Sequence, residues 1–242
     1  ADTAEIPEGN GHGGARSMHM GGAALFKAAQ EVIEKGKPVA ARLLQAQPDQ
    51  VVFAAGRFSA GDRSVDLLTV ARDTSLDTYV WNLLDIITFP NGCHVAEVEI
   101  DPETGQVTLD RYTAVDDYGT LINPLLTIGQ VQGGVAQGIG QALTEHTVYD
   151  PDSGQLLSGS FMDYQIPRAI DLPDLDITLT GIPTTANPLG VKGSGQAGAI
   201  AAPQTIISAI LNALAPLGVT HIDMPATPER VWRVIQQAGN RA

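Results

Sequence analysis

The feature that most constrains this chain is a glycine-rich loop placed directly before a long apolar segment. The loop, Asn187-Pro-Leu-Gly-Val-Lys-Gly-Ser-Gly-Gln-Ala-Gly198, holds four glycines around one basic residue, Lys192, and one amide, Gln196. A loop so poor in side chains lets backbone N–H groups approach a bound anion or cofactor closely. The apolar residues of 199–214 cover most of a helix circumference, so we expect a helix there. The loop then lies at a helix N-terminus, where unpaired donors and the helix dipole favour negative charge.

The residues of this loop, taken alone, allow three interpretations. Gly193-Ser-Gly-Gln-Ala-Gly198 matches the glycine pattern of dinucleotide-binding folds, and Asp223 closes a strand-like run, 219–223, where an acid could contact ribose. Such a glycine loop should directly follow a buried strand, whereas the preceding apolar run ends near Ile182 and is followed by prolines. The second interpretation is a purely structural glycine turn. The third is a cofactor loop, which depends on the further matches given below.

A second glycine-rich segment, 9–22, also leads directly into an expected helix, 23–35. Arg16, Ser17 and the nearby backbone amides would form a grip for a phosphate or pyrophosphate group. The alternative is a flexible lead-in at a chain terminus. Two separate glycine-rich segments thus each precede the start of a helix.

The segment 122–145 places five glycines inside one expected helix, which begins with Asn123 as N-cap and Pro124 in the first position. Each such glycine costs up to about 1 kcal/mol relative to alanine, so a compensating reason must exist. At about 100° per residue, one narrow face combines glycine with amide side chains, which suits either a bound heterocycle or tight helix packing with glutamines at the rim. The residues of that face are Gln130, Gly134, Gln137 and Gln141.

The remaining pattern predicts an α+β fold with mixed or antiparallel sheets and packed helices. Segments 94–100 and 107–115 predict a hairpin whose turn has Gly105 in the left-handed position. The other expected strands are 51–55, 79–89, 157–166 and 175–179; the other expected helices are 40–47, 64–72 with Ser64 or Asp62 as its cap, and a closing helix that begins at Thr227.

Composition narrows the class of protein and its partners. Apolar residues make up 43% and charged residues 17% of the chain, which is typical of a soluble globular protein. No apolar run approaches the roughly 18 residues of a transmembrane helix, and the first residues lack the apolar core of a signal peptide. With 14 basic against 27 acidic residues the net charge is −13, so neither nucleic acid nor insertion into a membrane is expected.

Cysteine and histidine usage predicts no metal site built by this chain alone. Cys93 is the only cysteine, which excludes an internal disulfide and an iron–sulfur or zinc site made within the chain. His12 and His19 lack a carboxylate or cysteine at metal-ligand spacing, so we expect ordinary loop histidines. A reducing cytoplasm is the simplest location.

Several segments, taken together and in order, resemble the molybdenum hydroxylase family. They are Gly13-Gly-Ala-Arg-Ser-Met18, Phe89-Pro-Asn-Gly-Cys-His-Val-Ala-Glu-Val-Glu-Ile-Asp-Pro102, Asp116-Asp-Tyr-Gly119, Ile122-Asn-Pro124, Gly129-Gln-Val-Gln-Gly-Gly134 with Gln137-Gly138, and Asn187-Pro-Leu-Gly-Val-Lys-Gly-Ser-Gly195. The resemblance is to the C-terminal part of the molybdopterin-binding large subunits of xanthine dehydrogenase and aerobic carbon monoxide dehydrogenase. It implies that residues 1–242 form one C-terminal molybdopterin-binding region, either a fragment or one half of a split subunit, with the fold of the second molybdopterin-binding domain.

The resemblance also implies a set of site residues. The residue after Gly195 should project toward molybdenum, and in the family it is a glutamate that acts as general base. Here it is Gln196, whose amide cannot accept a proton near neutral pH. The residues implied to contact a molybdopterin-type molybdenum cofactor, its cytosine dinucleotide form included, are Gly14, Ala15, Arg16, Ser17, Met18, Gln130 and Gly195.

By resemblance the chain belongs to a molybdenum-dependent oxidoreductase that hydroxylates a small organic substrate, such as an aldehyde, a purine or an N-heterocycle. It would work with a complementary molybdopterin-binding chain, an iron–sulfur subunit with [2Fe–2S] clusters and an FAD subunit. The alternative is a non-catalytic cofactor-binding or assembly module that has lost its base. Glu97 and Glu145 are other carboxylates, but nothing in the sequence places either beside Gln196.

Overall fold

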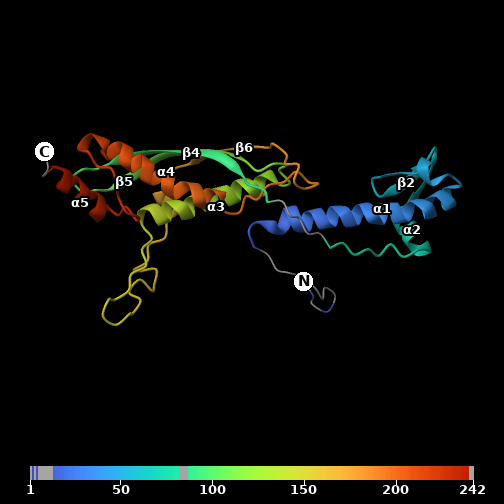
Figure 1. Ribbon diagram of the computed structural model, residues 1–242, viewed down its shortest axis with the longest axis horizontal. Helices are drawn as coiled ribbons and strands as arrows, with labels where there is room; N and C mark the ends of the chain where they lie inside the picture. Colours follow the sequence, from blue (N-terminus) through green and yellow to red (C-terminus); the bar gives the residue numbers. More distant parts are fainter. Residues whose placement is uncertain (1, 3, 5–12, 82–86, 240–242) are drawn as a thin grey trace. The chain divides into compact units, whose positions relative to one another are not determined.

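The structure is a computed structural model that describes residues 2, 4, 13–81 and 87–239; His12 lies outside them. The chain divides into two compact units, Ala1–Ile87 with Thr185–Leu189, and Thr88–Thr184 with Gly190–Ala242. Each has its own hydrophobic core, and Figure 1 shows the helices and strands that form each unit.

The first unit is built on one long helix, α1, Ala23–Leu44, which continues from a π-helical turn, Ser17–Gly22. Two helices separated at Gly36 and Pro38 were expected, but α1 runs through both. Gly36 provides room for the buried Phe58 ring, because a Cβ at Gly36 would lie 2.6 Å from it. Phe58 belongs to a three-stranded antiparallel sheet of β1, Val52–Ala54, β2, Arg57–Ala60, and β3, Arg63–Asp66.

Strand β3 replaces the first part of the helix expected at 64–72, and it pairs with β2. A tight turn joins β1 to β2, because Ala55 and Gly56 have φ values of 48° and 76°. The helix that follows, α2, Leu67–Asp73, is capped by Asp66, whose side chain accepts a hydrogen bond from the Thr69 N–H at 2.7 Å. The prediction missed the hairpin because its strands are short. β1 matches the expected strand at 51–55, and a short 3₁₀ turn, Pro48–Gln50, precedes it.

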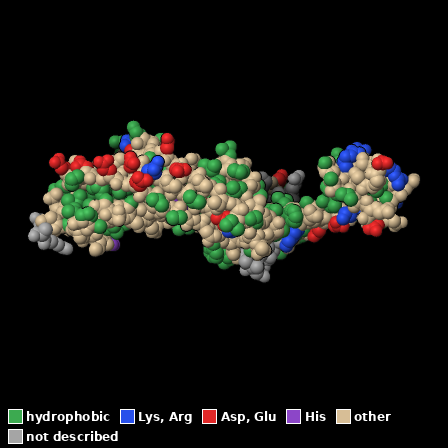
Figure 2. All heavy atoms as spheres, turned by 90° about the horizontal axis from the view of Figure 1, so that it is seen from above, with side chains coloured by type: hydrophobic (Ala, Val, Ile, Leu, Met, Phe, Trp, Pro, Cys, Tyr) green, Lys and Arg blue, Asp and Glu red, His purple; other side chains and the backbone are tan. Residues whose placement is uncertain are grey.

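The second unit is built on a mixed sheet in the order β4-β5-β6. β4, Asn91–Ile100, and β5, Val107–Asp117, form the expected hairpin, and Gly105 in its turn has φ of 75°. β6, Leu175–Thr180, was also expected and pairs with β5 in parallel. The α+β class with a mixed sheet is therefore confirmed. Figure 2 shows carboxylates spread over this unit, with few Lys or Arg side chains among them.

Three expected strands are wrong wherever the structure describes them. Residues 157–166 form turns and irregular backbone, and the preceding segment contributes only an isolated bridge between Tyr149 and Leu156. The described parts of 79–89 and the run 219–223 contain no strand. Short apolar runs next to Pro and Ser do not carry enough periodicity to tell a strand from an irregular connection.

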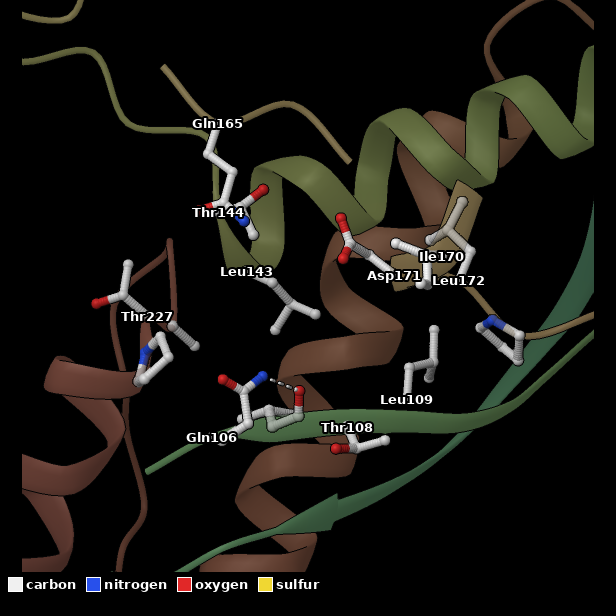
Figure 3. Close-up of a pocket in the computed structure, with 14 residues that line it drawn as sticks. Gln106, Thr108, Leu109, Leu143, Thr144, Gln165, Ile170, Asp171, Leu172 and Thr227 are labelled. Atoms are coloured by element: carbon white, nitrogen blue, oxygen red, sulfur yellow. Dashed lines mark hydrogen bonds between the residues drawn. The ribbon is translucent and has the colours of Figure 1, made fainter. Parts of the chain in front are cut away.

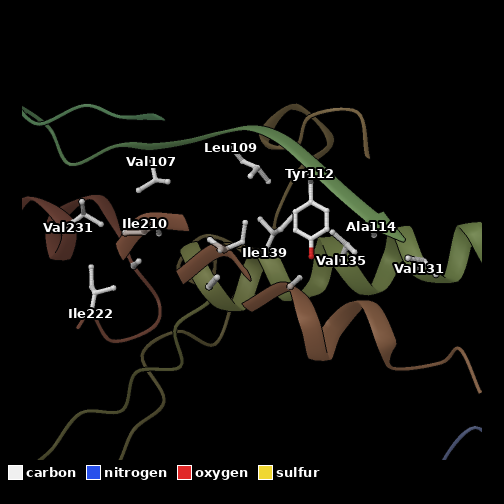
Figure 4. Close-up of a cluster of buried hydrophobic side chains, with 14 of the residues drawn as sticks. Val107, Leu109, Tyr112, Ala114, Val131, Val135, Ile139, Ile210, Ile222 and Val231 are labelled. Carbon is white, nitrogen blue, oxygen red and sulfur yellow. The ribbon is translucent and has the colours of Figure 1, made fainter. Parts of the chain in front are cut away.

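A β-bulge decides which side chains of β5 face the helices. Glu97 pairs with Arg111 and Val98 pairs with Leu109, so Asp110 is an extra residue in β5. One extra residue reverses the alternation of side chains between the two faces of the strand. The buried residues on the core face of β5, before and after the bulge, are Val107, Leu109, Tyr112, Ala114 and Asp116, and Figure 4 shows the first four on the core side of the strand.

The helices α3, Pro124–Leu143, and α4, Ala197–Leu214, pack against each other through glycine. A Cβ at Gly134 would lie 3.0 Å from the Ala199 nitrogen, and a Cβ at Gly198 would lie 2.6 Å from the Val131 carbonyl oxygen. A Cβ at Gly138 would lie 2.7 Å from the Ala202 Cβ. Close packing on α4 is therefore the compensating reason for Gly134 and Gly138, whereas a Cβ at Gly129 or Gly133 would meet nothing within 4 Å. Gln137 and Gln141 of α3 are exposed.

The ends of these helices follow the sequence prediction. The Asn123 side chain accepts a hydrogen bond from the Leu126 N–H at 3.2 Å, as an N-cap should. The closing helix, α5, Pro228–Gly239, begins after Thr227 as expected. Short 3₁₀ turns lie at Ala169–Asp171 and Ala215–Leu217.

The region Ala197–Leu217 is long and apolar enough to cross a membrane by length and composition, although no such run was expected. A helix in the core of a globular protein passes the same test. Ile206, Ile210 and Leu214 of α4 are buried in the core with α3 and the sheet.

Gly198→Ala should lower the free energy of unfolding by about 1–3 kcal/mol, because the new methyl group meets backbone atoms of α3 that have little room to move. Gly133→Ala is the matched control, since a Cβ there has no neighbour within 4 Å; it should raise the free energy of unfolding by about 0.5–1 kcal/mol. Urea unfolding followed by circular dichroism measures both changes. Equal effects of the two substitutions would contradict the packing account.

Candidate cofactor-binding site

Two of the expected site residues meet where the N-terminal end of α4 lies beside the middle of α3. The Gln130 side chain donates from Nε2 to the Gly195 carbonyl oxygen at 2.8 Å. The two helices run in the same direction, because Gly134 faces Gly198 and, one turn later, Gly138 faces Ala202. The dipole of α4 favours negative charge at its own N-terminal end, directly after the Gly195 carbonyl that Gln130 holds.

Gln196 is the N-cap residue of α4. Its backbone has φ −114° and ψ −8°, and its carbonyl oxygen accepts the Ile200 N–H at 3.0 Å, which begins the helix. Its side chain is exposed and makes no capping hydrogen bond. An amide here can donate and accept hydrogen bonds to a ligand, but it cannot take up a proton near neutral pH.

The start of the glycine loop is fixed to the end of β5. Lys192 donates its backbone N–H to the Tyr118 carbonyl oxygen at 3.0 Å, and Thr120 donates its N–H to Gly190 at 2.9 Å. Gly119 lies between them with φ of 66°, and a Cβ there would lie 2.2 Å from the Gly190 carbonyl oxygen. Glycine is required at this position for both its conformation and its lack of a side chain.

The dinucleotide-binding interpretation of the loop is wrong. β6 ends at Thr180, and only an isolated bridge at Val191 lies between that strand and Gly193. The glycine pattern of a dinucleotide-binding fold requires a buried strand directly before the first glycine.

The basic residue of the loop is paired within the protein. Lys192 Nζ donates to Asp117 Oδ2, and only 12% and 11% of the two side chains are exposed. Asp117 Oδ1 also accepts the N–H groups of Gly119 and Ile182, both at 2.9 Å. Burial by itself would raise the pKa of Asp117, but Lys192 and these two donors outweigh burial and lower it. No sequence signal joined these two residues, which are 75 positions apart.

A buried hydrogen-bond network lies on the other face of β5. His94 Nε2 lies 3.1 Å from Asp116 Oδ1, and its Nδ1 lies 2.7 Å from the Tyr112 hydroxyl. Since a carboxylate only accepts, Nε2 carries a proton toward Asp116, and in the neutral imidazole Nδ1 then accepts from the Tyr112 hydroxyl. The Tyr118 hydroxyl donates to Asp116 Oδ2 at 2.8 Å. Burial raises the pKa of both tyrosines, so both hydroxyls keep their protons.

Sequence reasoning missed this network, although alternation along β4 places His94 on the inner face with Ala96 and Val98. A hollow of about 400 Å³ reaches His94 and Asp116, with Ala197, the residue after Gln196, in its wall. Gly92 also lines this hollow, and a Cβ there would lie 1.8 Å from Asp116 Oδ1, so any side chain at this position would displace the carboxylate.

A second hollow, of about 540 Å³, lies at the opposite end of α3 (Figure 3). Its polar lining is uncharged except for Asp171, which is already paired with Arg168 at 2.9 Å. Gln130 and Leu143 are 13 residues apart in α3, or roughly 20 Å. This hollow is therefore separate from the Gln130 end of the helix. Its polar side chains are Gln106, Thr108, Thr144, Gln165, Asp171 and Thr227.

Neither of the other carboxylates considered lies in position to replace a base at Gln196. Glu145 follows the C-terminal end of α3 and accepts the Tyr164 hydroxyl at 2.6 Å. Glu97 is exposed on β4 and lies 3.7 Å from Arg111. Within 13–81 and 87–239, no group of three His, Cys, Asp or Glu side chains could hold a metal ion.

The remaining expected site residues, Gly14 to Met18, lie in the first unit. Gly14 and Ala15 have φ values of 62° and 57°, and this left-handed backbone is strained for alanine. Arg16 donates from Nε to the Gly13 carbonyl oxygen at 2.7 Å. The π-helical turn from Ser17 follows, a feature frequently found at functional sites.

This segment has room for a ligand. A Cβ at Gly14 or Gly21 would meet nothing within 4 Å, so the backbone is open there. The buried His19 Nδ1 has no hydrogen-bond partner. Open backbone, a nearby guanidinium and an unsatisfied ring nitrogen fit a large phosphate-containing ligand.

Replacing Asp117 by Asn should make stability less sensitive to acid. The pKa of Asp117 is lowered in the folded state, so its contribution is complete above the ordinary value of 3.8 and is lost as pH falls through the lowered folded value. The difference in unfolding free energy between wild type and Asp117→Asn should therefore shrink as the pH falls from 6 to below 3.8. Asp176→Asn, at an exposed position on β6, is the control. A difference that stays constant or grows in acid would contradict this assignment.

Comparisons with known proteins agree with this arrangement. The family model described as molybdopterin cofactor-binding domain matches residues 1–173. The chain is 36% identical over 96% of its length to the 6-hydroxypseudooxynicotine dehydrogenase complex subunit gamma of Paenarthrobacter nicotinovorans, and it spans 31% of that relative.

Two solved structures share the fold. Quinoline 2-oxidoreductase from Pseudomonas putida 86 matches at 35% identity with a TM-score of 0.85, covering 95% of this chain and 31% of that one. A Cu,Mo-CO dehydrogenase in its carbon monoxide reduced state matches at 28% identity with a TM-score of 0.89, covering 99% of this chain and 32% of that one. The chain thus spans about a third of the proteins it matches, and it belongs to the molybdopterin cofactor-binding family of the molybdenum hydroxylases.

Proposed function

We propose that this chain is the cofactor-binding part of a molybdenum hydroxylase that oxidises a ring carbon of an N-heteroaromatic substrate. The observation that carries the proposal is the placement of position 196, at the N-cap of α4 and directly after a carbonyl group held by Gln130. Relatives named for a nicotine derivative and for quinoline support the choice of substrate over an aldehyde or a purine.

The residues present fit a molybdopterin-type cofactor. Open backbone at Gly14 and the guanidinium of Arg16 would hold its pyrophosphate side, with Ala15, Ser17 and Met18 in the same segment. Gln130 would offer Oε1 as an acceptor, since its Nε2 is already bound to Gly195. When bound, the cofactor supplies molybdenum for the oxidation of a C–H bond. A cytosine dinucleotide form suits the same phosphate grip.

Gln196 would act as a hydrogen-bonding group at the position of a general base. Its exposed side chain can orient a ligand but cannot store the proton released in the oxidation. Substrate oxidation by the protein with Gln196 should therefore be slow.

Other subunits complete the proposed enzyme. Names such as "subunit gamma" and "large chain" among the relatives imply complexes of several chains. We propose that a complementary molybdopterin-binding segment, a [2Fe–2S] subunit and an FAD subunit carry the electrons onward, and that the complex works in the cytoplasm.

Gln196→Glu should raise turnover by about 10²–10⁴-fold, the usual contribution of a positioned base. The complex purified with its partner chains is assayed by dye-linked oxidation of quinoline, nicotine, hypoxanthine and benzaldehyde, and the two N-heteroaromatics that lack a purine ring should react fastest. Gln137→Glu, the same change at an exposed position of α3, is the control and should leave the rate unchanged. If Gln196→Glu remains as inactive as wild type on all four substrates, the chain is a non-catalytic cofactor-binding module.

A further inference from the structure

We propose that Asp117 and Lys192 are positioning residues that hold the side chain at position 196 in place. The proposal rests on the proposed function in one respect, since position 196 is taken to face the cofactor. It concerns residues to which neither the resemblance nor the family match assigns a role.

Asp117 joins three segments that are distant in the sequence. Its own backbone ends β5, its Oδ1 accepts the Ile182 N–H from the segment after β6, and its Oδ2 binds Lys192 in the glycine loop. The Gly119 N–H is a second donor to Oδ1. A carboxylate with three donors from three places fixes their separation, which no single backbone hydrogen bond would do.

The loop between Lys192 and Gln196 needs such fixing. Only Gly193, Ser194 and Gly195 lie between them, and glycines have more backbone freedom to lose than any other residue. Lys192 is held at one end by Asp117, and the Gly195 carbonyl is held at the other by Gln130. With both ends fixed, this short loop sets where α4 begins and where the residue at 196 lies.

Charge balance favours positioning over ligand binding as the role of Lys192. It is the only Lys or Arg between Arg168 and Arg230, yet Asp117 cancels its charge inside the protein. Buried ion pairs seldom stabilise a protein more than apolar residues of the same size would, and their better-attested use is to specify one geometry. The ion pair between Asp117 and Lys192 is therefore suited to fixing the position of this loop, in which the other side chains are small.

A spin label at position 196 tests the proposal directly. Gln196→Cys is made in a Cys93→Ser background, because Cys93 is the only other cysteine of this chain and is exposed, and the chain is labelled before it is assembled with its partner chains. Nitroxide mobility is then compared with Asp117→Asn, with Lys192→Met and with both together, in the purified complex. The double variant leaves no unpaired buried charge, so it avoids the loss of stability that such a charge would cause. A change in label mobility in the double variant therefore reports a loss of position. Asp171→Asn, which breaks the more exposed pair with Arg168, is the control.

The expected result is a rotational correlation time at position 196 at least twofold shorter in the double variant, with no change in Asp171→Asn and none for a label at exposed Gln141→Cys. In a Gln196→Glu background, the double variant should lower kcat at least tenfold with KM unchanged. An unchanged correlation time at 196, or an equal change at 141, overturns the proposal. If the label at 196 becomes mobile in the double variant but the Gln196→Glu complex shows no turnover at all, the result counts against the proposed function and leaves the positioning role intact.

Discussion

The contact between α3 and α4 is the constraint on which the second unit depends. Gly134 and Gly198 leave no Cβ between the two backbones, so the helices approach until backbone atoms of each reach the other. This contact also places the N-terminal end of α4 beside the middle of α3, where Gln130 reaches the Gly195 carbonyl. The glycines that would weaken an isolated helix thus define where the candidate site lies.

Much of this arrangement was predictable because local chemistry and tertiary packing agree. The hairpin around Gly105, the Asn123-Pro124 helix start and the apolar α4 each combine periodicity with a capping or turn residue. The spacing of glycines and glutamines in α3 indicated that Gln130 and Gly134 share one face of the helix. In the structure these two residues have different roles, because Gly134 packs on α4 and Gln130 binds the glycine loop before α4. The 3.6-residue period of the helix was therefore enough to identify the face of α3 that carries both residues.

Other features depend on long-range partners that a single sequence does not reveal. The bulge at Asp110 turns Tyr112, Ala114 and Asp116 inward, which strict alternation from Leu109 would not do. Asp117 and Lys192 each look like surface charges in their own segments, and only the fold makes them partners. The expected strand at 157–166 failed for the opposite reason, since its apolar residues lack a neighbouring strand. Tertiary context decided all three cases.

The central claim is that this chain holds a molybdenum cofactor, and metal analysis with pterin release on the purified complex tests it most directly. The account predicts molybdenum and pterin in amounts equimolar with this chain, and loss of both when Arg16→Ala and Gly14→Val disrupt the expected grip in the first unit. A folded complex, with its partner chains present, that contains neither molybdenum nor pterin would contradict it.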